Sequence, residues 1–338
     1  MVAIHDVMPA FGLLQPASIA QALGLLARHG QDAWVMAGGL DSFDWLKDRI
    51  KKPKVLVDLS GIDELSGVKV GIDGVEIGAM TTLTEVVNDP VIGKKYGLLA
   101  QGVEAAASPQ IRNQGTLGGN VSQDARCWYY RGGWPCYRAG GNICYADTPE
   151  GKNREHAILH ADRCVAVNPS DSAPALIALD ARFVIRSERG ERVLEAEDYF
   201  VGPDIDITRL NVLRPDELLT AIRIPSTWAD AQFYFEKVRD RNVWDFALMS
   251  VASALVTSGE RIERIRIAVN GAAARPLHLA AVEAAVRGQL RDLETAKRAG
   301  KMAARGADPL QFNAYKVPLM RNLVMRSIGA RGETTWAS

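Results

Sequence analysis

The chain has 338 residues, of which 47% are hydrophobic and 24% charged, a balance typical of globular proteins with two or three domains. Its 40 basic residues equal its 40 acidic residues, so it lacks the positive field that attracts nucleic acids and anionic membranes. It also lacks an export signal and any run of ~18 apolar residues, so we expect a cytoplasmic protein without membrane insertion, or a periplasmic one if a partner with a twin-arginine signal carries it.

Helical and strand patterns alternate over the first hundred residues. Apolar residues at helical spacing predict a helix over 16–30, which ends at a glycine suited to a C-cap. A short apolar run at 34–36 predicts a strand that stops at two glycines, and a capped helix then runs to residue 49. The next expected elements are a strand at 55–57, a hairpin-like region around 75–77, a short helix from Thr82 and a helix over 98–107.

Residues 108–164 differ in composition from the rest of the chain. They contain eight glycines, three prolines and all four cysteines, so we expect mostly loop. A loop of this length inside a compact domain is commonly functional.

Regular structure is expected to resume at residue 165. The remaining pattern predicts an α+β arrangement of two lobes with a boundary near Pro225. The expected strands are 165–167, 183–185, 222–224, 233–238, 248–256 and 263–269, and the expected helices are 173–178, 278–287, 293–304 and 315–327.

Two glycine-containing loops are candidate ligand sites. The first, at residues 37–41, lies between a predicted strand and a predicted helix, where glycines let a pyrophosphate approach backbone N–H groups. Taken alone, this pattern is equally typical of a structural turn. The second, at residues 111–120, adds threonine and asparagine side chains to three glycines. Neither loop matches the Rossmann fingerprint or the P-loop motif.

These loops belong to a series of strings that runs along nearly the whole chain. The series resembles the FAD-binding subunit of the molybdenum hydroxylases, the family that includes xanthine dehydrogenase, aldehyde oxidoreductase and carbon monoxide dehydrogenase. The matching strings are AGGLD at 37–41, IRNQGTLGGN at 111–120, PSDSAPALIALDA at 169–181, FEKVR at 235–239, DFA at 245–247 and IAVNGAAARP at 267–276. The string at 111–120 is the most specific of them.

The resemblance implies a fold and a domain organisation. It implies an α+β protein whose FAD-binding domain of the PCMH type, built from two α/β subdomains, spans residues 1–226. A cysteine-rich insertion interrupts that domain at about 121–164. A C-terminal α+β domain, similar to the carbon monoxide dehydrogenase flavoprotein C-terminal domain, follows at 227–335.

The resemblance also implies the residues that bind FAD. Two glycine loops hold its pyrophosphate in the family, and an acidic residue, a leucine and a lysine supply further contacts. Carried over by motif, the implied residues are Val35, Met36, Ala37, Gly38, Gly39, Leu40, Asp41, Ser42, Thr116, Gly118, Gly119, Asn120, Asp124, Leu219 and Lys237. Leu40 departs from the family pattern, in which threonine is common, and so lacks the hydroxyl that would contact a phosphate there.

The four cysteines are candidate metal ligands. Cys127, Cys136, Cys144 and Cys164 are spaced C-x8-C-x7-C-x19-C. Spacing alone leaves three readings open: unrelated buried thiols, a zinc site, or a 4Fe-4S cluster, which requires four thiolates. The surrounding strings resemble the subset of the family similar to periplasmic aldehyde oxidoreductases, which implies a 4Fe-4S cluster on these four cysteines.

The implied function is electron transfer. A large partner subunit with a molybdenum cofactor would act on the organic substrate, and a small 2Fe-2S subunit would deliver electrons to FAD on this chain, which passes them to an external acceptor. No catalytic residue is therefore assigned here. The alternatives are a flavin subunit like that of 4-hydroxybenzoyl-CoA reductase, a self-sufficient flavin oxidoreductase, and a zinc-stapled structural subunit without flavin.

Overall fold

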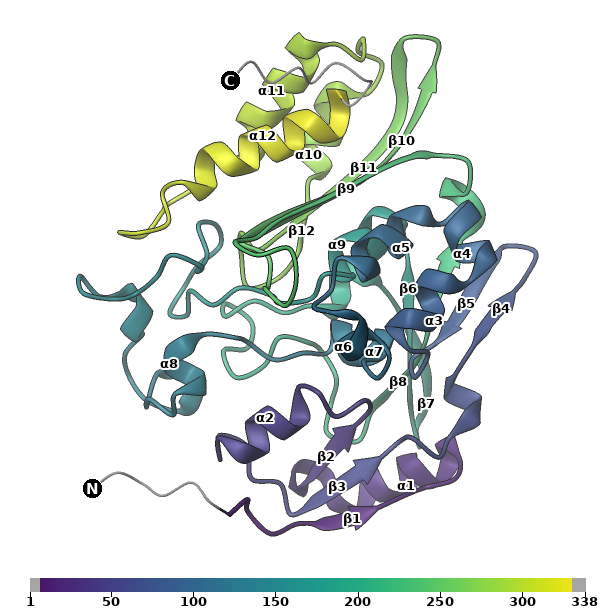
Figure 1. Ribbon diagram of the computed structural model, residues 1–338, viewed down its shortest axis with the longest axis vertical. Coiled ribbons are helices and arrows are strands. Elements are labelled where there is room, and N and C mark those ends of the chain that lie inside the picture. The colour runs from purple at the N-terminus through teal and green to yellow at the C-terminus, as the bar shows by residue number, and fades with distance from the viewer. Residues whose placement is uncertain (1–6, 330–338) are drawn as a thin grey trace.

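Three β-sheets organise the chain, each with its own hydrophobic core (Figure 1). The computed structural model describes residues 7–329. Two predictions therefore fall partly outside the described range. They are the expected lack of an export signal, which involves residues 1–6, and the expected domain end at residue 335. Within residues 7–329, no helix is long and apolar enough to cross a bilayer.

A small parallel sheet, with strand order β1-β3-β2, forms the N-terminal part. The first helix packs on it through Leu23 and Leu26. Ser18 caps the start of this helix, because its Oγ accepts from Gln21 N at 3.3 Å, and Gly30 ends it at a φ of +50°. The elements are β1 (Gly12–Leu14), α1 (Ile19–His29), β2 (Ala33–Met36), α2 (Ser42–Lys47) and β3 (Val55–Asp58).

A five-stranded antiparallel sheet, with strand order β4-β5-β8-β6-β7, forms the middle part. Its strands are β4 (Val68–Val70), β5 (Gly74–Gly78), β6 (Arg182–Ser187), β7 (Gly190–Glu195) and β8 (Leu218–Pro225). Helices gather over one face of this sheet (Figure 1). They are α3 (Leu83–Asn88), α4 (Pro90–Lys95), α5 (Gly97–Glu104), α6 (Pro109–Arg112), α7 (Leu117–Val121) and α9 (Ala173–Ala178).

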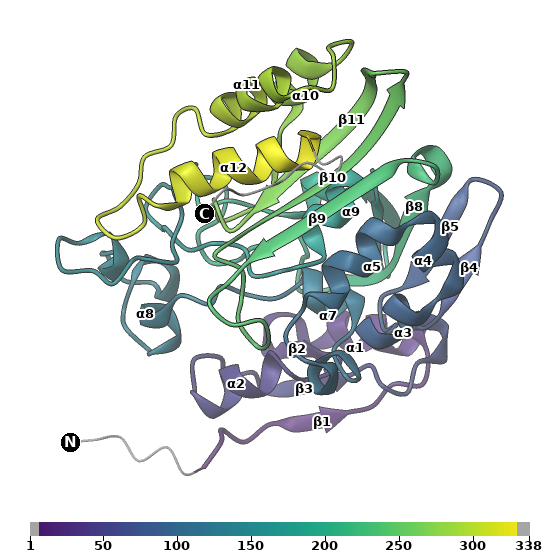
Figure 2. The same cartoon turned by 45° about the horizontal axis from the view of Figure 1, so that its top comes forward.

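A four-stranded antiparallel sheet, with strand order β12-β11-β10-β9, forms the C-terminal part. Its strands are β9 (Gln232–Val238), β10 (Met249–Ser258), β11 (Arg261–Asn270) and β12 (Leu277–His278). The C-terminal helices cover one face, and the other face packs on α5 and α9 of the middle part (Figure 2). These helices are α10 (Ala280–Val286), α11 (Leu293–Ala303) and α12 (Lys316–Gly329).

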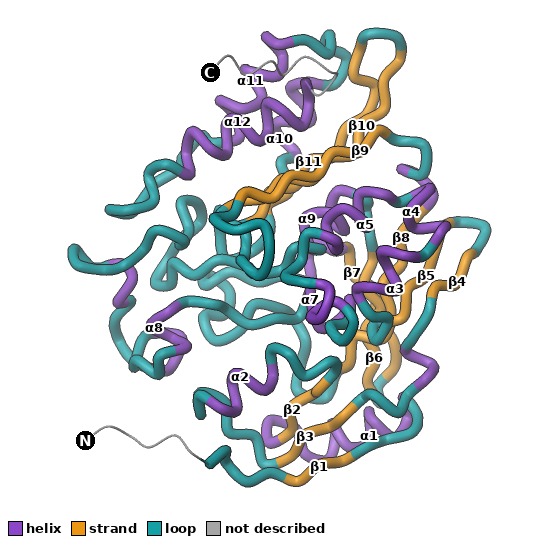
Figure 3. The backbone as a smooth tube through the Cα atoms, viewed as in Figure 1, coloured by secondary structure: helices purple, strands orange, loops and turns teal. Residues whose placement is uncertain are grey.

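The cysteine-rich segment, residues 121–164, is mostly loop and contains one short helix, α8 (Trp128–Arg131) (Figure 3). Its final residues enter the C-terminal core, where Ile158 is fully buried. Short 3-10 turns lie in this segment and elsewhere, at Gly30–Asp32, Asp63–Leu65, Tyr137–Ala139, Tyr145–Asp147, Ala196–Tyr199 and Ser226–Trp228.

The expected α+β class is confirmed, and most expected elements are present within a few residues of their predicted bounds. The strand expected at 165–167 is wrong. Val165 and Ala166 are buried, but Val165 O accepts from Ala157 N at 2.8 Å, so the run pairs with a loop instead of a sheet. Strands β1, β7 and β12 were not predicted.

Candidate functional site

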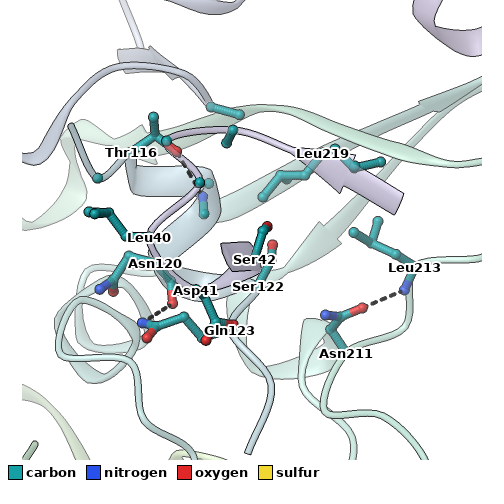
Figure 4. A pocket seen from close by; sticks show the side chains of 18 of the residues that line it. Leu40, Asp41, Ser42, Thr116, Asn120, Ser122, Gln123, Asn211, Leu213 and Leu219 are labelled. Atoms are coloured by element: carbon teal, nitrogen blue, oxygen red, sulfur yellow. Dashed lines mark hydrogen bonds between the residues drawn. The ribbon is translucent and has the colours of Figure 1, made fainter. Parts of the chain in front are cut away.

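A cavity of about 830 Å³ opens where the two glycine loops meet (Figure 4). The β2–α2 loop and α7 form one side, where Leu40, Thr116 and Asn120 lie. Strand β8 and the loop before it form the other side, with Leu213 and Leu219. A cavity of this volume is large enough for a dinucleotide-sized ligand.

The first glycine loop comes directly against the second. A Cβ on Gly38 would lie 2.1 Å from the carbonyl oxygen of Gln114, and Gly39 has a φ of +77°. Both positions therefore require glycine. Within residues 7–329, the backbone N–H groups of residues 38–42 have no hydrogen-bond acceptor. These N–H groups are available to an anionic ligand in the cavity.

In the second loop, the N–H groups of Gly118 and Gly119 already have acceptors within the protein. Gly118 N donates to Ala79 O at 2.9 Å, and Gly119 N donates to Thr116 Oγ1 at 3.0 Å. Asn120 Oδ1 accepts from the hydroxyls of Ser170 at 2.7 Å and Ser172 at 2.6 Å. The Asn120 amide nitrogen has no acceptor within the described residues, so it is the polar donor that this loop presents to the cavity.

The expected FAD-binding residues line this cavity with three exceptions: Met36, Asp124 and Lys237. Lys237 Nζ lies 2.7 Å from Asp171 Oδ2 and also donates to Ala105 O at 3.0 Å. Asp171 itself lines the cavity, so Lys237 is separated from the cavity by its ion-pair partner. Burial lowers the pKa of Lys237 and raises the pKa of Asp171, while each group opposes that change in the other.

Asp124 belongs to a network of charges that joins the cavity wall to the cysteine-rich segment. Its Oδ2 lies 3.2 Å from Lys51 Nζ, its Oδ1 accepts from Arg138 at 2.9 Å, and its backbone N donates to Asp41 Oδ2 at 3.3 Å. Asp41 Oδ1 in turn lies 2.8 Å from Arg131. The first glycine loop and the cysteine-rich segment are therefore linked by paired, largely buried charges.

Several residues that line the cavity were not expected from the sequence. They include Gln31, Arg126, Asn211, Leu213, Trp244 and Phe246. Trp244 N donates to Ala107 O at 2.9 Å, and Trp244 has a φ of +73°, a strained conformation for an aromatic residue. Phe246 belongs to the DFA string at 245–247, which the family resemblance includes, whereas no motif marks Gln31, Asn211 or Leu213.

All four cysteines line a second, small cavity. They are free thiols, and Cys136 and Cys164 are buried. The cavity has a volume of about 10 Å³, which is room for about one water molecule. Within residues 7–329, no three Cys, His, Asp or Glu side chains are close enough to hold a single metal ion.

Three of the four cysteines occupy the same kind of position in the backbone. Cys127, Cys136 and Cys144 each occupy the residue before a short helical turn. Burial raises the pKa of Cys127 to about 11, although backbone N–H groups of the following turn favour the thiolate. His156 Nε2 lies 3.2 Å from Cys127 Sγ, and burial together with Lys316 lowers the pKa of His156 to about 4. Four thiols thus line the cavity, and the imidazole of His156 lies next to one of them.

Four cysteines around one cavity are the donor set that a 4Fe-4S cluster uses. Ligands of one ion converge within a single bond length, whereas cluster ligands bind different iron atoms and lie farther apart. All four thiols line one cavity. Because the cavity is smaller than a cluster, the cysteine-bearing turns must move apart to accept one.

Comparison with known proteins gives matches over nearly the whole chain. Residues 9–227 match the family described as FAD binding domain in molybdopterin dehydrogenase, and residues 233–330 match the CO dehydrogenase flavoprotein C-terminal domain. The chain is 33% identical to the aldehyde oxidoreductase FAD-binding subunit PaoB of Escherichia coli (strain K12), over 77% of this chain and 81% of that protein.

Similarity to carbon monoxide dehydrogenase extends over the full length. The chain is 27% identical to the carbon monoxide dehydrogenase medium chain of Hydrogenophaga pseudoflava, over 95% of this chain and 97% of that protein. A solved structure of carbon monoxide dehydrogenase from the same organism, which lacks the Mo-pyranopterin moiety, matches with a TM-score of 0.77 and 26% identity, covering 96% of this chain and 98% of that chain.

Proposed function

This chain belongs to the family of FAD-binding medium subunits of molybdenum hydroxylases, and we propose that it passes electrons from partner subunits through FAD to an external acceptor. It is an oxidoreductase subunit by family. The proposal assigns residues 1–226 to FAD binding and 227–335 to the C-terminal flavoprotein domain. The observation that carries it is the cavity between two glycine loops with unpaired backbone N–H groups.

We assign the FAD diphosphate to the N–H groups of residues 38–42 and to the Asn120 amide. These donors are held in place before the ligand arrives, because Gly38 packs on Gln114 and Asn120 Oδ1 is fixed by two serine hydroxyls. Leu213 and Leu219 form an apolar wall that excludes water from one side of the ligand. FAD, when bound, supplies the ring system that accepts and releases electrons.

The partners are a small subunit with 2Fe-2S clusters and a large subunit with a molybdenum cofactor. The support is that two relatives are named medium chain or medium subunit, of carbon monoxide dehydrogenase and of nicotine 6-hydroxylase. Substrate chemistry then takes place on the large subunit. In keeping with this division, we assign no general acid or base in this chain to the organic substrate.

The four cysteines are proposed to hold a 4Fe-4S cluster of the aldehyde oxidoreductase type. Support comes from the four free thiols around one cavity, from the turn that follows each of three cysteines, and from the 33% identity to an aldehyde oxidoreductase FAD-binding subunit. Thiols with raised pKa values release protons on binding iron, so cluster binding would weaken at low pH.

The variant Asn120→Asp tests the FAD site. The aspartate keeps the oxygen that accepts from Ser170 and Ser172, and it replaces the amide donor by a negative charge facing the diphosphate. We expect the dissociation constant for FAD to rise at least tenfold, or about 1.4 kcal/mol, measured by flavin fluorescence titration. Asn88→Asp, on the exposed end of α3, is the matched control and should bind FAD normally. Equal affinity of both variants would overturn the assignment.

Iron and acid-labile sulfide analysis tests the cluster. The chain purified without oxygen should contain about four of each per molecule, as a 4Fe-4S cluster requires. Stoichiometric zinc without sulfide would contradict the cluster while leaving the FAD assignment in place.

A further inference from the structure

Arg138 lies almost fully buried at the cysteine cavity. It belongs to the 3-10 turn after Cys136, its side chain is 1% exposed, and it lines the cavity with all four cysteines. An arginine side chain carries five N–H donors and stays charged in proteins. Arginine is rarely buried unless its N–H groups are paired. The hydrogen-bond partners of Arg138 therefore indicate what the cavity can bind.

Only part of this guanidinium is paired. Nη1 donates to Asp124 Oδ1 at 2.9 Å. Nε and Nη2 are buried and make no hydrogen bond of ordinary geometry within residues 7–329, although the Cys164 thiol lies close enough to interact with the guanidinium. Buried donors without acceptors are costly in free energy, and a neighbouring cavity is where an acceptor can sit.

The charges around the cavity favour an anion. Asp124 is shared between Arg138 and Lys51, whose Nζ lies 3.2 Å from its second oxygen. One carboxylate thus faces two cations, and the rest of the guanidinium lies beside the Cys164 thiol and over the Tyr130 ring, 5.7 Å from its centroid. A ligand that brings negative charge into this cavity would balance the excess.

We propose that Arg138 donates from Nε and Nη2 to sulfur atoms of the 4Fe-4S cluster and raises its reduction potential. The proposal rests on the cluster assigned under the proposed function. Reduction adds one electron to a group that is already negative, and a buried cation stabilises the more negative form. No bond breaks and the guanidinium keeps its protons, so Arg138 tunes and positions the cofactor without taking part in chemistry.

Arg138→Gln is the direct test, in the full-length chain purified without oxygen and titrated with dithionite under EPR detection. We expect the ratio of reduced to oxidised cluster at a given potential to fall about tenfold, a shift of ~59 mV to lower potential for one electron. Arg138→Lys keeps the charge and should shift less. Arg163→Gln is the matched control, because Arg163 lines the same cavity but its side chain is 59% exposed, so water screens its charge.

Equal potentials for Arg138→Gln and Arg163→Gln would overturn the inference while the cluster assignment stands. Wild-type protein without iron would overturn both, and the FAD assignment would be unaffected. If Arg138→Gln does not fold, wild-type protein labelled with ¹⁵N-arginine replaces it. Pulsed EPR of the reduced cluster should then detect coupling to arginine nitrogen that Arg163→Gln retains, and absence of that coupling would overturn the inference.

Discussion

Lys316, at the start of α12, connects the cysteine-rich segment to the C-terminal part. It is fully buried, and its Nζ donates to the carbonyl oxygens of Glu155 at 2.8 Å, His156 at 2.9 Å and Gly271 at 2.8 Å. Burial lowers the pKa of Lys316 to about 7. Three carbonyls match the three donors of an ammonium group, so the side chain satisfies acceptors from two distant loops at once.

The variant Lys316→Met keeps the length of the side chain and removes its donors. Three buried carbonyls then lack a partner, so we expect the free energy of unfolding in urea to fall by about 3 kcal/mol. Lys301→Met, at an exposed position on α11, is the control and should change stability by less than about 0.5 kcal/mol. A loss equal to that of the control would mean that water replaces Lys316 at the three carbonyls.

His278 gives a prediction about pH. Its Nδ1 lies 2.9 Å from Glu197 and its Nε2 lies 2.8 Å from Glu283, while Arg266, beside Glu197, opposes the charged ring. Burial alone lowers the pKa of His278, but the two glutamates raise it further than burial lowers it. The stability that His278 contributes is therefore complete below about pH 6.5, the ordinary pKa of histidine. This stability is lost as the pH rises through the pKa of His278 in the folded state.

The measurement is the unfolding free energy in urea at several pH values from 6 to 9. The stability difference between the wild type and His278→Gln should shrink as pH rises. Lys316, whose pKa is lowered to about 7, adds a pH dependence of the opposite sign that is common to both proteins. His29→Gln, at the end of α1, should keep the wild-type slope. Parallel slopes for the wild type and His278→Gln would contradict the assignment.

At the scale of elements, local patterns predicted most of the fold. Helix α1 could be predicted because apolar spacing, a serine cap and a terminal glycine all agree. The run at 165–167 could not be told from a strand, because a short apolar run looks the same whether its backbone pairs with a sheet or with a loop. That distinction depends on Ala157, which lies in the cysteine-rich segment before this run. The sequence shows no pattern that would pair Ala157 with residues 165–167.

The candidate site could be read from local sequence mainly at its two glycine loops, and Leu219 on β8 was placed by the family resemblance. Residues 38–41 and 116–120 carry their own signal, because close backbone approach demands glycine. Asn211 and Trp244 reach the cavity from segments that carry no such demand. The flavin contact expected of Lys237 from its family motif stays a prediction, and its Nζ pairs with Asp171, which lines the cavity.

The contact between the two glycine loops gives a prediction at this scale. Gly38→Ala places a Cβ 2.1 Å from Gln114 O, so the loops must separate. We expect FAD affinity to fall more than tenfold, with a stability loss of about 1–3 kcal/mol. Gly93→Ala, in α4, adds a Cβ that meets nothing within 4 Å and should bind FAD normally. Normal FAD binding by Gly38→Ala would show that the loop geometry does not hold the diphosphate.

At the scale of the whole molecule, the final residues of the cysteine-rich segment enter the C-terminal core. Ile158 is fully buried there, its N donates to Ala272 O at 2.8 Å, and its carbonyl accepts from Asp308 N at 2.8 Å. The same segment is tied to the first glycine loop through Arg131 and Asp41. The segment therefore connects the N-terminal and C-terminal parts of the fold.

Truncation of Ile158 tests this integration. Ile158→Ala should lower the free energy of unfolding by about 2–5 kcal/mol, because it leaves a cavity in the C-terminal core. Ile143→Ala, in the same segment but 37% exposed, should cost much less. Similar small losses for both variants, measured by urea unfolding, would indicate that the segment folds apart from the core.

The central claim is that one FAD binds between the two glycine loops. The most direct measurement is to release the flavin from the purified, folded full-length chain by heat and to quantify FAD per chain by chromatography. We predict one FAD per chain, with at least tenfold weaker retention in Asn120→Asp. A folded chain that contains no flavin and takes up none on incubation with FAD would contradict the account.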